Sequence, residues 1–65
     1  MNAKQIGARL IELRGNKTQG KVAQDLGITP SSLPMYENGE RIPRDEVKIK
    51  IAKYYDTTVE AIFYV

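Results

Sequence analysis

The side chains of this chain that could act on another molecule are hydrogen-bonding groups rather than catalytic ones. The sequence has no cysteine and no histidine, so the commonest metal ligand and acid–base catalyst is absent. Neither a disulfide nor a cysteine-ligated metal site can form, and no pair of carboxylates suggests a catalytic pocket. We therefore expect no enzyme activity, no metal, no cofactor and no small-molecule ligand.

Polar groups suited to binding an anion meet at Thr18-Gln19, where the sequence predicts a helix to begin. Thr18 is the expected N-cap. The free N–H groups of the first turn and the helix dipole together form a phosphate site, toward which Gln19 would project. The alternative is that Thr18 only caps the helix and that Gln19 faces solvent.

A second candidate surface is the outer face of a helix expected from Pro30 to about Glu37. Its outward positions are Pro30, Ser31, Pro34 and Met35. Ser31 can bond to a base edge or a phosphate, whereas Pro34 and Met35 can contact only apolar features such as a thymine methyl group. Pro34 lies beyond the first turn of this helix, so we expect an irregular, 3₁₀-like start. The alternative is that this face contacts no base.

The elements that position these side chains lie between Gln19 and Tyr36, where the sequence predicts two short helices joined by a tight turn. Apolar residues recur at helical spacing in both: Val22, Ala23 and Leu26, then Leu33 and Tyr36. Gly27 can end the first helix in a left-handed conformation, and Thr29 can cap the second with Pro30 at its first position. This spacing fits a helix-turn-helix crossing, which presents the second helix to a DNA major groove. An ordinary helical hairpin inside a core remains the alternative.

Three further helices complete an expected all-α domain of five short helices spanning residues 1–65. The first would be capped by Asn2 with Gln5, bury Ile6, Leu10 and Leu13, and end at Gly15-Asn16. The fourth would start at Pro43 and bury Val47 and Ile51, with Lys48, Lys50 and Lys53 in water. The fifth would be capped by Thr57 with Glu60 and carry Val59, Ile62 and Phe63.

Charge is unevenly distributed in this chain of 65 residues and net charge +2. Residues 1–21 hold five basic side chains and one acidic, a net of +4, which suits a polyanion. A charged surface that is merely solvated is the alternative. No apolar run is long enough to span a membrane and no secretory signal opens the chain, so we expect a cytoplasmic protein, either nucleoid-associated or in the host cytoplasm if phage-encoded.

Two motifs resemble the Cro/C1-type (XRE-like) helix-turn-helix family of bacterial and phage regulators. They are Thr18-Gln19…Val22-Ala23…Leu26-Gly27-Ile28-Thr29 and Tyr36-Glu37-Asn38-Gly39-Glu40-Arg41-Ile42-Pro43. The resemblance covers nearly the whole chain. It implies a lambda-repressor-like DNA-binding domain with the helix-turn-helix at about residues 18–37. The implied function is sequence-specific binding of duplex DNA, with the helix at about 30–37 in the major groove.

The resemblance also implies roles for individual residues. Pro30, Ser31, Pro34 and Met35 would face the bases, Gln19 and Asn38 would contact the DNA backbone, and Arg14 and Glu37 would form a structural ion pair. Gln19 would in addition support the recognition helix. To the backbone contacts we add Thr18, because it starts the helix, and Lys17, Lys21 and Arg41, because of their charge.

The expected partner is a palindromic operator bound by a homodimer, and we expect the regulator to be a repressor. The apolar tail Ile62-Phe63-Tyr64-Val65 is either packed into the core or used in a subunit contact, and we choose it as the dimer contact. The recognition face is poor in polar groups, because Pro30 and Pro34 stand where the family often has small or polar residues. The alternative function is therefore a protein-interaction module or antitoxin-type component on the same fold, with weak or no DNA binding.

Overall fold

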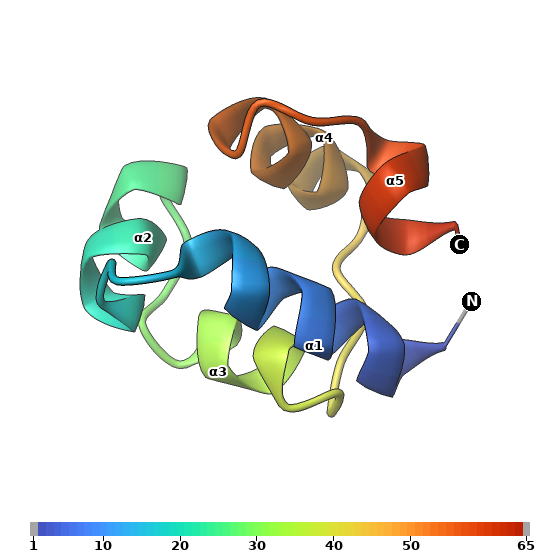
Figure 1. Cartoon of the computed structure of the whole chain (residues 1–65). Helices are drawn as coiled ribbons and strands as arrows, with labels where there is room; N and C mark the ends of the chain where they lie inside the picture. Colours follow the sequence, from blue (N-terminus) through green and yellow to red (C-terminus); the bar gives the residue numbers. More distant parts are fainter. Residues whose placement is uncertain (1, 65) are drawn as a thin grey trace.

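The computed structural model describes residues 2–64, which form five helices and no strand (Figure 1). These are α1 (Ala3–Arg14), α2 (Gln19–Leu26), α3 (Ser32–Glu37), α4 (Asp45–Tyr54) and α5 (Val59–Phe63). The short helices α2 and α3 follow each other across a tight turn, and α1 packs against both α3 and α5. The predicted all-α class with five helices is confirmed.

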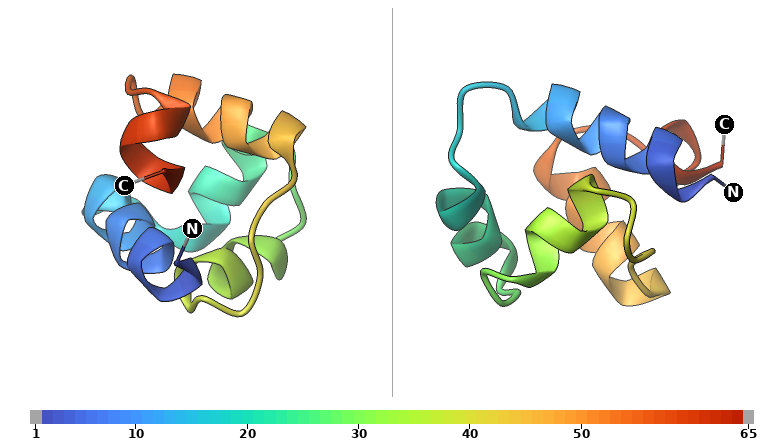
Figure 2. Two further views of the ribbon diagram at one scale, coloured as in Figure 1. Left: turned by 90° about the vertical axis from the view of Figure 1, so that its right-hand side faces the viewer. Right: turned by 90° about the horizontal axis from the view of Figure 1, so that it is seen from below.

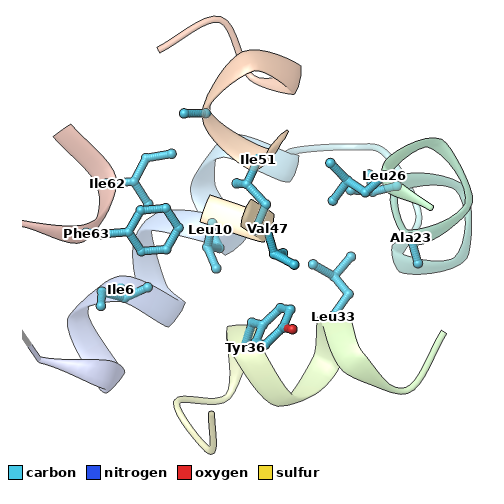
Figure 3. Packing of buried hydrophobic residues seen from close by; sticks show 12 residues of the cluster. Ile6, Leu10, Ala23, Leu26, Leu33, Tyr36, Val47, Ile51, Ile62 and Phe63 are labelled. Atoms are coloured by element: carbon cyan, nitrogen blue, oxygen red, sulfur yellow. The ribbon is translucent and has the colours of Figure 1, made fainter. Parts of the chain in front are cut away.

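One hydrophobic core joins all five helices (Figure 3). Figure 2 shows the arrangement of the helices from two further sides. Each helix contributes buried apolar side chains, which are Ile6, Leu10, Val22, Ala23, Leu26, Leu33, Tyr36, Val47, Ile51, Ala52, Ile62 and Phe63. Full burial of a large apolar side chain stabilises a fold by roughly 1.5–3 kcal/mol. Leu13 was expected in this core but is 38% exposed.

The backbones of α1 and α3 touch at Gly7. A Cβ atom added to Gly7 would collide with the carbonyl oxygen of Glu37 and lie 2.8 Å from the Glu37 carbonyl carbon. A larger residue would therefore push α3 away from α1. This contact explains a glycine in a helix interior, where it otherwise costs up to about 1 kcal/mol relative to alanine.

The predicted boundaries of α2 agree with the structure. The Thr18 hydroxyl accepts a hydrogen bond from the Lys21 backbone N–H at 3.1 Å, so Thr18 is the N-cap. At the other end Gly27 has φ +72°, and the amide of Ile28 donates to the carbonyl of Ala23. Glycine occupies such a left-handed position without the steric cost that a Cβ would bring.

Helix α3 begins at Ser32, two residues later than predicted, so Pro30 belongs to the preceding turn. The Ser32 amide donates to the Thr29 carbonyl, a bond that spans three residues, and this confirms the irregular start. With the later start Pro34 is the third residue of α3. Its missing N–H falls within the first turn, where no helical hydrogen bond is lost.

The starts of α4 and α5 each lie slightly beyond the predicted positions. Helix α4 begins at Asp45, and Pro43 is buried ahead of it. In α5 the cap is Thr58 rather than Thr57, because it is the Thr58 hydroxyl that accepts the Ala61 N–H at 3.0 Å.

Three residues expected at the surface or in an interface are instead buried. Lys48 was placed on the wet side of α4, but it is 6% exposed and its Nζ donates to the Tyr64 hydroxyl at 3.2 Å. Ile62 and Phe63 were offered as a dimer contact, but each is 1% exposed and packs into the core of its own chain. Of that proposed contact Tyr64 remains exposed, and Val65 lies outside the described residues.

Candidate nucleic-acid interface

The exposed side of α3 carries the residues that were predicted to face DNA bases. The side chains of Leu33, Tyr36 and Glu37 point into the molecule. Because successive residues of a helix are turned by about 100°, Pro34 and Met35 lie on the other side, where both are half-buried. Pro30 and Ser31 are exposed in the turn just before the helix.

A buried carboxylate connects the end of α3 to the start of α2. The Glu37 side chain is 1% exposed and accepts a hydrogen bond from Arg14 Nε at 2.7 Å, so the predicted ion pair is present. Its other oxygen accepts from Gln19 Nε2 at 2.8 Å. Arg14 Nη1 also donates to the Lys17 carbonyl at 2.8 Å, which fixes the loop ahead of α2. Glu37 therefore joins α1, α2 and α3 at one point.

The electrostatics of this network favour the charged form of Arg14. The hydrogen bond to Glu37 raises the pKa of Arg14 above its ordinary value, so the guanidinium is protonated at every accessible pH. Tyr55 is near the same carboxylate. Burial, and secondly the Glu37 charge, raise the pKa of Tyr55 to about 12, and its hydroxyl is buried without a partner among the described residues.

Lys17 and Lys21 lie toward α4 rather than toward α3. Lys17 Nζ is 4.8 Å from the centre of the Tyr54 ring, and Lys21 Nζ is 3.1 Å from an oxygen of Asp25. The Tyr54 hydroxyl donates to the other Asp25 oxygen at 2.7 Å. These two hydrogen bonds, from Tyr54 first and Lys21 second, lower the pKa of Asp25. Sequence reasoning missed this cluster, because nothing in the pattern pairs residues so distant along the chain.

A groove of about 420 Å³ lies between α3 and the segment that leads into α4. Ser32, Tyr36, Arg41 and Arg44 are among its lining residues, and the Arg41 guanidinium is 6.0 Å from the centre of the Tyr36 ring. Asn38 is exposed at the end of α3. The structure thus adds Arg44 to the predicted positive groups beside α3.

Gly39, the residue after Asn38, holds this end of α3 close to α1. Its φ is +75°, and a Cβ added there would lie 3.1 Å from the Lys4 Cα atom. A side chain at this position would therefore be strained and crowded.

In the part of the chain that the structure describes, no helix is long and apolar enough to cross a membrane.

Comparisons with known proteins place most of the chain in one family. A family model described as helix-turn-helix matches residues 8–62. The chain is also similar to the cryptic phage CTXphi transcriptional repressor RstR of Vibrio cholerae serotype O1, with 36% identity over 47 residues. That alignment covers 72% of this chain and 42% of the relative, so the chain spans less than half of the relative's length. No solved structure matches the chain significantly.

Proposed function

The chain belongs to the Cro/C1-type helix-turn-helix family of DNA-binding transcriptional regulators, and from this premise we propose that it binds duplex DNA as a bacterial or phage transcriptional repressor. In this proposal α3, with the turn ahead of it, enters the major groove. The similarity to a phage repressor supports the repressor function.

The observation that carries the proposal is the hydrogen-bonded connection through Glu37. It binds Arg14 at 2.7 Å and Gln19 at 2.8 Å from opposite oxygens of a carboxylate that is almost fully buried. The start of α2 and the end of α3 are therefore held in one geometry. A rigid relation between a phosphate-binding group and a groove-entering helix is what a DNA-binding site needs, because both must fit the duplex at once.

The start of α2 offers an open approach for a phosphate. The backbone N–H groups of Gln19 and Gly20 belong to the first turn of a helix and have no helical partner. Gly20 has no side chain of its own, and nothing lies within 4 Å of the position that its Cβ would occupy. On the opposite side of α3, exposed Asn38 and the guanidinium of Arg41 supply further donors to a second phosphate.

The chain is further proposed to act as a homodimer on a palindromic operator. Two recognition helices on adjacent half-sites would lie about 34 Å apart, one turn of DNA. Tyr64, 54% exposed, is the described residue of the predicted dimer tail that could still contact a second copy.

The test is fluorescence anisotropy of the protein with a pool of random duplexes at low and at physiological salt. Binding should weaken steeply with salt, because Lys and Arg displace counterions from phosphates. Arg41→Ala should reduce the slope of log affinity against log salt by about one. Lys53→Ala is the matched control, because Lys53 is exposed on α4, and its slope should equal that of the unmodified protein.

The alternative, a protein-interaction module, is supported by one observation, the scarcity of polar side chains on the exposed face of α3. Absence of binding to every duplex even at low salt would overturn the DNA proposal. In that case capture of a defined protein partner through the α3 face would establish the alternative.

A further inference from the structure

We infer that the exposed face of α3 reads its DNA through the methyl groups of thymine rather than through hydrogen bonds to base edges. This inference rests on the proposed DNA binding and specifies what that binding recognises. It predicts that the positions of thymines define a half-site. In such recognition, apolar contacts with the bases take the place of hydrogen bonds between side chains and base edges.

The side chains on this face carry almost no free hydrogen-bonding groups. Pro30, Pro34 and Met35 are apolar. Of the nearby hydroxyls, that of Ser32 lies 2.7 Å from that of Thr29 and is hydrogen-bonded to it, whereas the exposed Ser31 hydroxyl, 3.4 Å from the same Thr29 oxygen, is at most weakly bonded. Such a surface cannot form the bidentate pairs by which Arg, Asn and Gln distinguish guanine and adenine.

An apolar surface in the major groove still distinguishes bases, because thymine alone among the four presents a methyl group there. Proline rings suit this contact since they are rigid and lose no side-chain entropy on binding. Met35 adds a flexible, polarizable side chain that adapts to a neighbouring methyl group. Both Pro34 and Met35 are already half-buried, so their positions are constrained by the protein before DNA arrives.

The charge around the face favours DNA over an apolar protein partner. On one flank lies the start of α2, where the two uncapped N–H groups of Gln19 and Gly20 are open to an anion. On the other flank Arg41 and Arg44 line the groove beside Ser32 and Tyr36. Positive groups on both sides of an apolar strip complement the two phosphate backbones that border a major groove.

The experiment compares thymine with uracil in the same duplex. The tightest site selected from the random pool is synthesised with deoxyuridine in place of each thymine in turn, which removes one methyl group and leaves the hydrogen-bonding edges unchanged. Binding should weaken about fourfold for each contacted methyl group, the factor expected from the burial of one such group. The losses should fall on a few adjacent positions of each half-site.

A second comparison separates methyl readout from hydrogen bonding. Replacing a sensitive T·A pair by 5-methylcytosine·G keeps the methyl group but exchanges the acceptor on the thymine edge for a donor. Affinity should be higher than with unmethylated C·G at the same position. Met35→Ser should remove the thymine–uracil difference at one position, and Met35→Leu, which retains an apolar side chain of similar size, should preserve it.

The outcomes separate this inference from the function on which it rests. Salt-dependent binding with equal affinity for thymine and uracil at every position would overturn methyl readout and leave the DNA-binding proposal intact. Equal affinity for 5-methylcytosine·G and C·G would likewise count against it. A protein that binds no duplex at low salt, and uses the face for another protein, would overturn both.

Discussion

Replacement of Gly7 by alanine tests how closely α1 and α3 are packed. The added Cβ would collide with the Glu37 carbonyl oxygen and lie 2.8 Å from its carbonyl carbon and 3.0 Å from the carbonyl oxygen of Tyr36. All three atoms belong to the backbone of α3, so no side-chain rotation can make room. The two helices must instead separate, which loosens the core around the fully buried Leu10 of α1 and Leu33 of α3.

Two opposing effects set the size of the change in stability. Alanine is a better helix former than glycine by up to about 1 kcal/mol. Overpacking of a core typically costs 1–3 kcal/mol, and an obstacle made of backbone belongs at the upper end, about 3 kcal/mol. The expected net loss in the free energy of unfolding is therefore about 2 kcal/mol. For a domain of this size that lowers the melting temperature by roughly 8–16 °C.

The matched control is Gly20→Ala, a change of the same kind in another helix. No atom lies within 4 Å of the Cβ that it adds, so only the helix preference of alanine remains and stability should rise by up to about 1 kcal/mol. Urea and thermal unfolding, followed by circular dichroism, measure both variants. An unchanged or higher melting temperature for Gly7→Ala would refute the close contact between α1 and α3.

Three further perturbations address the Glu37 network and the DNA contacts. Glu37→Ala should lower the free energy of unfolding by about 2 kcal/mol, less than for a fully buried pair because Arg14 is 20% exposed and can reach water; unchanged urea unfolding would contradict this. Asn38→Ala should weaken binding to all duplexes about equally in anisotropy assays, as expected for a phosphate contact, whereas a sequence-selective loss would argue against that role. Tyr55 should ionise near pH 12 in a spectrophotometric titration of the folded protein, later than an ordinary tyrosine. Because its pKa is raised on folding, its stabilising contribution is complete below pH 10 and declines as the pH rises from 10 to 12, so Tyr55→Phe should reduce the loss of stability over that range.

The regular elements were predictable because their determinants are local. Helix α2 begins after Thr18 and ends before Gly27, as the sequence predicts. Both signals are local, because an N-cap hydroxyl accepts a hydrogen bond from a backbone N–H of the first turn and a left-handed glycine ends the helix at its own position. The later start of α3 also has a local cause, because Pro34 is tolerated only in the first turn. Pro34 is visible in the sequence, and its place in the first turn is compatible with a helix that starts at Ser32 rather than at Pro30.

Features that depend on packing between distant segments could not be predicted from the pattern. Lys48 occupies a position that reads as solvent-facing, yet the α5 segment covers it and Tyr64 accepts its hydrogen bond. For Ile62 and Phe63 the pattern left two possibilities, burial in the core or a subunit contact, and the structure shows both side chains in the core. The Arg14–Glu37 pair was anticipated from family resemblance, but the shared hydrogen bond from Gln19 to Glu37 required the structure.

The central claim is that DNA contacts the exposed side of α3 together with the start of α2 and the segment around Asn38. Its most direct test is a titration of the ¹⁵N-labelled protein with a selected duplex, followed by NMR at low salt. We predict that amide shifts concentrate at residues 18–21, 31–33, 35 and 38–41, where every residue has a backbone N–H, while the exposed lysines of α4 change little. Shifts confined to α5 and the α5-facing side of α1, or none on addition of excess duplex, would contradict the account.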